Sequence, residues 1–223
     1  MLNKLLRYVF FICIVRPFVW LVLGLRVRDR QNLPDQGPAI ICSNHNSHLD
    51  TIVLMTLLPI SRLHLVHPGA AADYWWDSNR WIRWFGEHII GVVPVYRNRS
   101  ETTGDPLQAC YSVLEENKIL IFFPEGGRGE PEQMRPFKRG LVILGERFPD
   151  VPIIPVYMHG MGKSWPRGSN MILPFICDVF IGRAITYQQS PQDLIPRLTA
   201  AVNQLAAQGN FPQWLPKEAT NPR

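Results

Sequence analysis

The sequence predicts an α/β fold, a mixed β-sheet flanked by helices, with an N-terminal helical segment that associates with a membrane. From residue 39 onward, short apolar runs alternate with helical patterns, and this alternation is typical of a sheet covered by helices. The N-terminus instead holds two apolar runs in close succession. Charged residues make up only 18% of the chain against 46% hydrophobic residues, a balance that fits membrane association better than a freely soluble surface.

The two N-terminal runs, residues 8–15 and 18–25, flank Arg16 and Pro17. Each is shorter than the roughly 20 apolar residues that cross a bilayer. We therefore expect a helical hairpin or a kinked pair of helices in one leaflet, with a kinked span and then a buried core helix as alternatives. No small-residue cleavage site follows, which disfavours a signal peptide. The cations expected to anchor the segment are Lys4, Arg7, Arg16, Arg26, Arg28 and Arg30.

A chain of 223 residues is long enough for one hydrophobic core. We expect a membrane-associating helical segment over residues 1–30 and one globular domain over residues 31–223, with turn-rich residues 33–38 near the boundary. The 23 basic residues exceed the 18 acidic ones, which suits an anionic partner without choosing among lipid headgroups, nucleotides and nucleic acid. The four cysteines form no Cys-x-x-Cys pair and indicate reduced thiols in a cytosol-facing protein.

Periodicity and turn residues predict the remaining elements. The clearest strand is residues 118–126, where a run of apolar residues ends in Pro and Gly. Further strands are expected at residues 39–44, 62–67, 89–97, 151–160 and 175–185. Helices are expected at residues 50–58, 73–88, 105–117 and 137–148, and a C-terminal helix opens at residues 190–191 and is kinked or restarted by Pro196. The Gly-Lys-Ser at residues 162–164 lacks the preceding spacing of a Walker A motif.

The first candidate site is the polar stretch Asn44–Asp50, which leaves an apolar run and enters a helical pattern. A strand-to-helix loop of this length can bring the Asp50 carboxylate onto the His45 imidazole. The carboxylate then fixes the tautomer, and the other ring nitrogen is free to take a proton, as in a general base. We expect His48 to pack against the loop or cap the helix. A zinc site and a Cys42 nucleophile are less favoured, because no spaced ligand cluster is present and Cys42 lies in the apolar strand.

The second candidate site is the turn Phe-Pro-Glu-Gly-Gly-Arg-Gly at residues 123–129, where a buried strand ends. It combines backbone N–H groups with a guanidinium and a carboxylate. Arg128 is expected to bind a phosphate and Glu125 a nearby hydroxyl, the alternative being a glycine turn with a local salt bridge. Further cations at the ends of predicted elements are Arg97, Lys138 and Arg139.

Four blocks, in order, resemble the motifs of the glycerolipid acyltransferases. They are Asn-His-x-Ser-x-x-Asp at 44–50, Gly-x-x-Pro-x-x-Arg at 91–97, Phe-Pro-Glu-Gly-x-Arg at 123–128 and Val-Pro-Ile-Ile-Pro-Val at 151–156. The resemblance covers about residues 30–185. It implies the mixed sheet of a glycerol-3-phosphate acyltransferase-like fold and a place at the cytoplasmic face of the inner membrane.

The resemblance also implies transfer of a fatty acyl chain from acyl-CoA or acyl carrier protein to a lysophospholipid hydroxyl, most directly that of 1-acyl-sn-glycerol-3-phosphate. On matching positions, His45 is the base for that hydroxyl and Asp50 is its partner. Arg97 and the turn of Glu125, Gly126 and Arg128 resemble the acceptor headgroup site, to which we add Lys138. No metal, no cofactor beyond the thioester donor and no acyl-enzyme are implied.

One departure concerns position 127, where the family often has Thr or Ser and this chain has Gly. The missing hydroxyl keeps another lyso-lipid, such as a lyso-aminolipid, open as the acceptor. The acidic residues Glu130 and Glu132 either select against a bare phosphomonoester or belong to a surface loop. A non-catalytic lipid-binding protein is the alternative from another class.

Residues 73–89 contain four tryptophans interleaved with Arg80 and Arg83. Aromatic and basic side chains together favour a membrane interface, and core packing explains part of them. Similar residues stack on single-stranded nucleic acid. The four acyltransferase-like blocks argue against a nucleic-acid partner.

Overall fold

The computed structural model describes residues 2–76, 79–96, 104–165 and 171–211. A seven-stranded sheet has the order β1-β7-β6-β2-β5-β3-β4. Its strands are β1 (Leu23–Arg28), β2 (Ala39–Ser43), β3 (Val66–Ala71), β4 (Val93–Val95), β5 (Ile119–Phe122), β6 (Ile153–His159) and β7 (Phe175–Ile181). β6, β2, β5, β3 and β4 pair in parallel, whereas β7 runs antiparallel to β6 and parallel to β1. The predicted α/β fold with a mixed sheet is confirmed.

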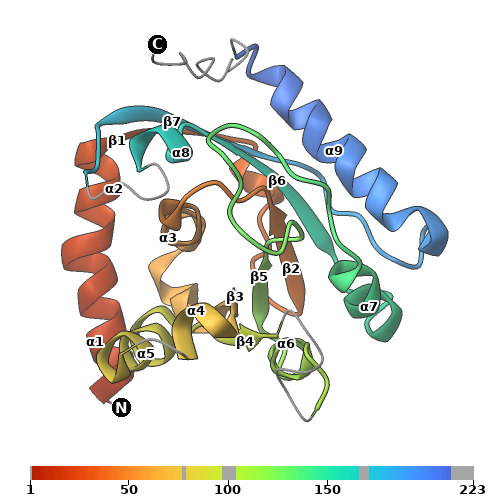
Figure 1. The fold of residues 1–223 in the computed structure, drawn as a ribbon, viewed down its shortest axis with the longest axis horizontal. Helices are drawn as coiled ribbons and strands as arrows, with labels where there is room; N and C mark the ends of the chain where they lie inside the picture. The colour runs from red at the N-terminus through yellow and green to blue at the C-terminus, as the bar shows by residue number, and fades with distance from the viewer. Residues whose placement is uncertain (1, 77–78, 97–103, 166–170, 212–223) are drawn as a thin grey trace, which may run out of the picture.

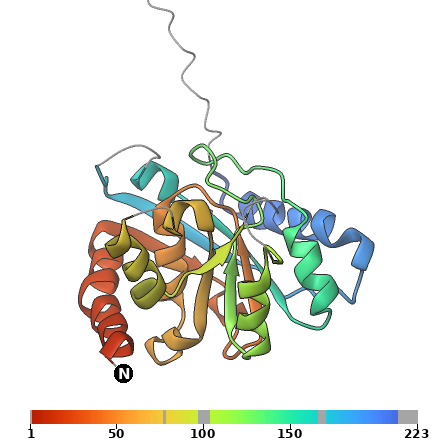
Figure 2. The same cartoon turned by 60° about the horizontal axis from the view of Figure 1, so that its bottom comes forward.

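Helices cover both faces of the sheet (Figure 1, Figure 2). On one face, Ile41 of β2 packs in a cluster with the N-terminal helical segment and α3 (His48–Leu57). On the other face, its neighbours Ile40 and Cys42 pack in a second cluster with α6 (Gln108–Glu115), α7 (Gly140–Arg147) and α9 (Leu194–Gln208). This alternation along β2 is the period-two pattern of a strand buried on both sides, as expected for a parallel sheet.

The N-terminal helical segment is continuous over Leu2–Val22. It consists of α1 (Leu2–Phe10), a π-helical stretch η1 (Phe11–Val15) and α2 (Arg16–Val22). Pro17 lies in the first turn of α2, where the π-helical stretch passes into the α-helix and the missing N–H is tolerated. The expected hairpin is therefore not formed. The run 18–25 is also split, because β1 begins at Leu23 and pairs with β7.

One stripe of this helix is buried against the domain. Arg7, Phe11, Val15 and Val19 recur at every fourth position and are all at most 7% exposed. This spacing places them on one helix face. The opposite face carries exposed apolar side chains, namely Leu2, Leu5, Leu6, Val9, Ile12, Ile14, Trp20 and Leu21.

Three of the cations expected to anchor the segment at a membrane bind backbone carbonyls. Arg7 donates from Nη2 to the carbonyls of Val66 (2.7 Å) and Ile90 (3.1 Å). Arg16 donates to Leu58, and Arg30 donates to Leu57. The expectation of interfacial anchoring is wrong for Arg7, which is buried and binds carbonyls at the start of β3 and the end of η4 (Gly86–Ile90). It stays a prediction for Arg16, which is half-buried, and for Arg30, which is exposed.

The segments around β3 and β4 differ most from the expectations. Residues 62–67 were expected as a strand, but a 3-10 helix η3 (Ile60–Leu65) precedes β3. Pro68 and Gly69 lower the strand propensity of β3, yet its pairing between β5 and β4 prevails. The strand expected at residues 89–97 shrinks to Val93–Val95, because Gly91 ends η4 in a left-handed conformation with φ of 76°.

The other elements confirm the expected types within a few residues. The tryptophan-rich segment is helical but broken into α4 (Ala72–Trp76), α5 (Arg80–Phe85) and η4. α8 (Met161–Ser164) follows β6, and short 3-10 turns lie at η2 (Arg30–Asn32) and η6 (Pro191–Asp193). α9 begins at Leu194, so Pro196 falls in its first turn. The division of the chain at residue 30 stays a prediction, although the sheet already begins at Leu23.

The parallel strands bring the ends of four segments to one edge of the sheet. Asn44 follows β2, Phe123 follows β5, Ala72 follows β3 and Gly160 follows β6. Ligands in open α/β sheets bind beyond the carboxyl ends of such strands. Both polar blocks singled out in the sequence, at 44–50 and 123–129, leave strands at this edge.

Candidate active site

Asn44 ties the loop after β2 to the neighbouring strand. Its Nδ2 donates to the Met158 carbonyl at 2.9 Å, and its Oδ1 accepts from the Met158 N–H at 2.8 Å. The side chain is 2% exposed. Because both bonds are shielded from water, they fix where the chain turns from β2 into His45.

Asp50 is held by the N-terminus of α3. Ser47 is the N-cap, its Oγ accepts from the Leu49 N–H at 3.3 Å, and Asp50 completes a capping box. Asp50 Oδ2 accepts the N–H groups of Asn46 at 2.6 Å and Ser47 at 2.8 Å. These donors and the positive end of the helix favour a carboxylate at this position even though Asp50 is 1% exposed.

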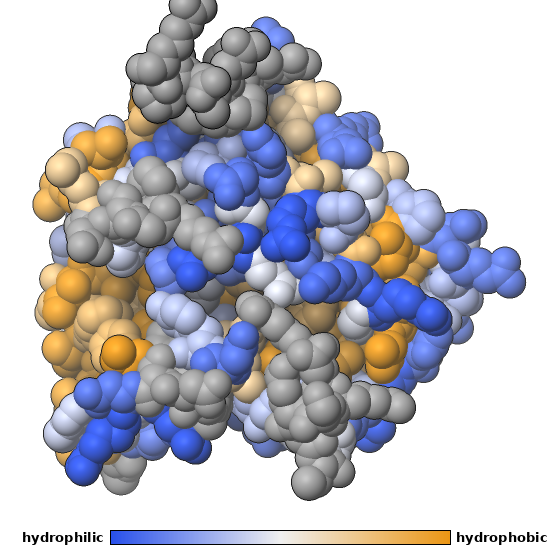
Figure 3. Space-filling view, viewed as in Figure 1, coloured by the Kyte–Doolittle hydropathy of each residue, from blue (hydrophilic) through white to orange (hydrophobic). Residues whose placement is uncertain are grey.

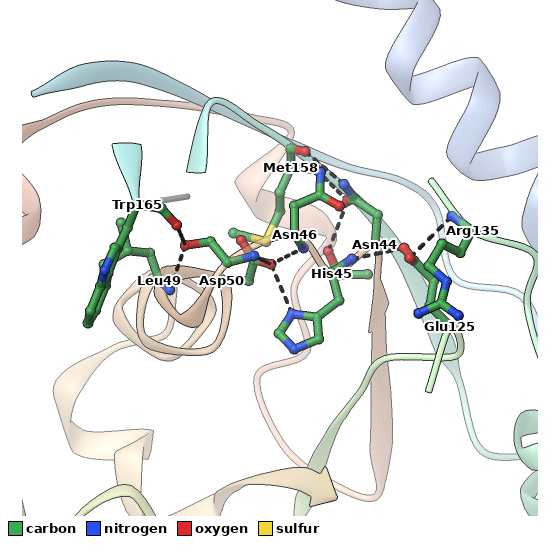
Figure 4. A network of polar contacts seen from close by, with 11 residues as sticks. Asn44, His45, Asn46, Leu49, Asp50, Glu125, Arg135, Met158 and Trp165 are labelled. Carbon is green, nitrogen blue, oxygen red and sulfur yellow. Dashed lines mark hydrogen bonds and ion pairs between the residues drawn. The ribbon is translucent and has the colours of Figure 1, made fainter. Parts of the chain in front are cut away.

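The His45 ring is hydrogen-bonded to the same oxygen of Asp50. Its Nδ1 lies 2.9 Å from Asp50 Oδ2 (Figure 4). With a carboxylate as acceptor, Nδ1 carries the proton, and the Nε2 lone pair is left to bind another hydrogen. The ring stacks on Phe123, with 4.0 Å between centroids, and its side chain remains 17% exposed. The arrangement is a hydrogen-bonded imidazole and carboxylate with one open ring nitrogen, which can act as a general base.

Glu125 lies behind His45 and is fully buried. Its Oε1 accepts from the His45 backbone N–H at 2.9 Å, and its Oε2 accepts from the Arg135 N–H at 3.2 Å (Figure 4). Burial raises the pKa of Glu125 to about 7, against the effect of these two N–H groups. The sequence predicted a carboxylate that meets the acceptor hydroxyl, but the structure places it where it positions the backbone of His45.

Arg128 lies on the open side of the same turn. Its guanidinium carbon is 5.6 Å from the centroid of the Tyr74 ring. Burial and then the nearby Arg128 guanidinium lower the pKa of His48 to about 4. His48 is therefore neutral at neutral pH, and its ring packs between Tyr74 and Trp165 at centroid distances of 5.5 and 5.4 Å. Arg128 thus brings a positive charge to the carboxyl edge, near His45.

Gly126 and Lys138 close the turn. Gly126 has φ of 69°, and a Cβ there would lie 3.0 Å from Cδ and Nζ of Lys138. The Lys138 N–H donates to the Pro124 carbonyl at 2.8 Å. The turn therefore requires a glycine for its backbone and for the passage of the exposed Lys138 side chain.

A known protein family covers the segments that form this site. The family model described as Acyltransferase matches residues 24–159, more than half of the chain. The chain belongs to the acyltransferase family. This range contains both polar blocks and the strands that carry them.

Two relatives illustrate the extent of the sequence similarity. The chain is 29% identical over 152 residues to the chloroplastic 1-acyl-sn-glycerol-3-phosphate acyltransferase BAT2 of Brassica napus, covering 66% of this chain and 40% of that protein. It is 27% identical over 190 residues to 1-acyl-sn-glycerol-3-phosphate acyltransferase alpha of Mus musculus, covering 81% of this chain and 61% of that protein. The chain thus spans about half the length of these relatives.

A solved structure shows the same fold at low identity. The crystal structure of the 1-acyl-sn-glycerophosphate acyltransferase PlsC from Thermotoga maritima superposes with a TM-score of 0.69 and 18% identity. The match covers 92% of this chain and 79% of that chain. The predicted glycerol-3-phosphate acyltransferase-like architecture is confirmed.

Within this acyltransferase-family chain, the expected site residues fall into three groups. The structure brings His45, Asp50 and Glu125 into one hydrogen-bonded network. Gly126, Arg128 and Lys138 belong to the turn at the same sheet edge. Arg97 lies outside the described residues.

Cys42 lies in β2, two residues before Asn44. Cys42 is fully buried, and burial raises the pKa of its thiol, so it is not a nucleophile in this family member. The sequence included Phe123 in the candidate turn but did not predict that its ring stacks on His45. Sequence reasoning missed Tyr74 as part of the site, because this residue was assigned with its tryptophan neighbours to the membrane.

Proposed function

We propose that this chain is an O-acyltransferase that moves a fatty acyl chain from an acyl-CoA or acyl carrier protein thioester to a lysophospholipid hydroxyl. The observation that carries the proposal is the His45–Asp50 pair, which has one open ring nitrogen beside a cationic turn. The names of the relatives support 1-acyl-sn-glycerol-3-phosphate as the acceptor and phosphatidate as the product.

The proposed reaction needs no acyl-enzyme. Nε2 of His45 takes the proton of the acceptor hydroxyl as its oxygen attacks the thioester carbonyl carbon. The carbon–sulfur bond then breaks, and the imidazolium returns the proton to the leaving thiolate. Asp50 stabilises the imidazolium through Nδ1, and its own buried position is supported by the α3 N-terminus.

Arg128 supports an acceptor that carries a phosphate, because a guanidinium binds phosphate oxygens in a bidentate manner. Of the two acidic residues in the following loop, Glu132 is 3% exposed and pairs with His159, whereas Glu130 is exposed. Gly127 is the feature that favours the second candidate, the same chemistry on another lyso-lipid.

The N-terminal helix supports attachment to a membrane. Leu2–Val22 is long and apolar enough to cross a bilayer by length and composition, with a mean hydropathy of 2.0 over its most apolar window. Figure 3 shows apolar residues along the edge where this helix lies. Since its inner stripe is buried in the domain, we propose that the helix lies in the plane of one leaflet with its exposed apolar face in the lipid. The free cysteines support the cytoplasmic face of the inner membrane.

An acyl-transfer assay on purified protein in mixed micelles tests the proposal. Radiolabelled oleoyl-CoA, palmitoyl-CoA and acyl carrier protein thioesters are paired with lysophosphatidate, a lyso-aminolipid and no acceptor. Labelled phosphatidate is the expected product. Turnover with another lyso-lipid alone supports the second candidate. Free fatty acid at the same rate without acceptor indicates a thioesterase, and lipid binding without any turnover contradicts the proposal.

A further inference from the structure

A second imidazole–carboxylate pair lies next to the candidate active site. Nδ1 of His159 is 2.6 Å from Oε2 of Glu132, and the two side chains are 7% and 3% exposed. His159 ends β6, the strand that pairs with β2 and carries the Asn44 contact at Met158. None of the proposed catalytic steps uses this pair.

The pair differs from His45: each ring nitrogen of His159 faces a side chain at close range, although Nδ1 and Glu132 Oε2 do not meet in hydrogen-bond geometry. Nδ1 faces Glu132, and Nε2 lies 3.4 Å from Nζ of Lys163. The ring also stacks on Phe211, with 3.6 Å between centroids and 5° between planes. Its neighbours leave this imidazole 7% exposed and give a substrate no access to either ring nitrogen, so we assign it a supporting role.

Glu132 is connected to His45 through one residue. In the amide orientation that satisfies both neighbours, Asn46 Oδ1 accepts from the Glu132 N–H and Asn46 Nδ2 donates to the His45 carbonyl, each at 3.1 Å. The same carbonyl accepts from the Gly129 N–H at 2.9 Å. Movement of Glu132 therefore acts directly on the backbone of His45.

The loop that carries Arg128 is attached to the domain on both sides of this residue. Residues 126–137 between β5 and α7 form no helix or strand, and Figure 1 shows this stretch crossing the ends of β2 and β6. Glu125 holds one end of the stretch, and Glu132 holds it further on by accepting the Gly160 N–H at 3.0 Å. Arg128 lies between these two buried carboxylates.

The second attachment is tightly built. Glu132 has φ of 60°, a left-handed conformation that is unusual for a glutamate. A Cβ at Gly162 would lie 3.0 Å from Pro131 Cα and 3.2 Å from Asn46 Cβ, so α8 approaches both segments closely. A strained residue persists where its surroundings over-determine it, and such residues concentrate at functional sites.

We infer that Glu132 and His159 are positioning residues. They hold the Arg128 loop in place and, through Asn46, also the backbone of His45. This inference rests on the proposed function and extends it to two residues outside the family-like blocks. Loss of the pair removes the attachment at Gly160 and leaves the loop held by the Gly129 N–H and by Glu125. Arg128 is then poorly placed to bind the acceptor headgroup, and His45 is poorly placed to accept the proton of the acceptor hydroxyl.

Glu132→Ala tests the inference, with Glu130→Ala as the matched control. Glu130 is exposed on the same loop and carries the same charge. We expect Glu132→Ala to lower kcat/KM for lysophosphatidate roughly 10- to 100-fold, with a raised KM for the acceptor and an unchanged KM for the thioester. Glu132→Gln keeps an acceptor for the Gly160 N–H and is expected to recover part of this loss. Glu130→Ala is expected to behave as wild type.

A double-mutant cycle with His159→Gln tests whether the two residues act as one unit. We expect Glu132→Ala/His159→Gln to be no worse than Glu132→Ala, because the pair is already lost. Unfolding midpoints of all variants separate loss of folded protein from loss of function. Losses that follow the folded fraction, or an unchanged acceptor KM in Glu132→Ala, would overturn the inference.

A binding measurement separates failure of this inference from failure of the proposed function. A short-chain lysophosphatidate is titrated calorimetrically into wild type, Glu132→Ala and Glu130→Ala. Weaker binding to Glu132→Ala alone supports the positioning role even if no acceptor turns over, an outcome that would contradict only the proposed function. Equal affinity in all three proteins overturns the positioning role.

Discussion

A single oxygen, Asp50 Oδ2, accepts hydrogen bonds from the His45 ring and from the backbone N–H groups of Asn46 and Ser47. The sequence predicted the His45–Asp50 contact from the length of the strand-to-helix loop, and the resemblance to the acyltransferase motif implied the same pair. The sequence did not predict the place of Glu125. Its burial depends on a stretch of loop that folds back over it, and this tertiary contact has no local signature.

Arg128 is expected to discriminate acceptors by charge. Arg128→Gln removes a charge-assisted hydrogen bond to phosphate, so the KM for lysophosphatidate is expected to rise about 10- to 100-fold, with little change for an uncharged lyso-lipid. Arg147→Gln, on the exposed end of α7, is the matched control. Steady-state kinetics with both acceptors provide the test, and an equal rise for both would exclude a phosphate contact.

Glu125 gives a pH dependence of stability with a definite sign. Its pKa is raised from an ordinary value of 4.5 to about 7, so the native state binds more protons than the unfolded state between these values. Stability therefore falls as pH rises through that window. In urea titrations at pH 5 and pH 8, the unfolding free energy of wild type relative to Glu125→Gln is expected to be lower at pH 8. A difference that is constant with pH would contradict the account.

Among the elements, the N-terminal helix shows how tertiary packing overrides a correct local signal. The sequence identified its apolar character, and the structure confirms a long apolar helix. Its boundaries differed, since Pro17 is accommodated after a π-helical stretch and Leu23 begins a strand. Arg7 looked like an interfacial cation, but burial at every fourth position places it inward. Only the partner carbonyls, some 59 and 83 residues away in sequence, explain that position.

Arg7→Met tests this buried contact against Lys4→Met on the exposed side of the same helix. Methionine leaves the Val66 and Ile90 carbonyls without the guanidinium, at an expected cost of about 1–3 kcal/mol in unfolding free energy. Lys4→Met is expected to change stability by less than about 0.5 kcal/mol. Chemical denaturation in detergent measures both, and equal effects would show that Arg7 does not support the domain.

At the scale of the whole molecule, the parallel pairing of strands brings the parts of the site together. The polar blocks at residues 44–50 and 123–129 meet because β2 and β5 are neighbours running in the same direction. Alternating strands and helices predicted such a sheet in general terms. The strand order and the β1–β7 pair at its edge were not predictable from the pattern, because partners so distant in sequence are chosen by packing rather than by local propensity.

The exposed apolar face of the N-terminal helix predicts how the molecule binds membranes. Leu5→Glu with Ile12→Glu places two charges on that face without touching the buried stripe. We expect binding to vesicles with anionic lipids to weaken by at least about 10-fold. Asn203→Glu with Ala207→Glu, exposed on α9 across the sheet, is the charge-matched control. Co-sedimentation provides the measurement, and equal losses in both double variants would mean that net charge rather than the helix face controls binding.

The most direct test of the central claim is the kcat for acyl transfer by His45→Ala, measured beside His88→Ala, which removes a half-buried histidine stacked on Trp84. If His45 is the general base, His45→Ala is expected to lower kcat on the order of 10²- to 10⁴-fold while His88→Ala stays at the wild-type value. A His45→Ala variant that retains the wild-type rate would contradict the account.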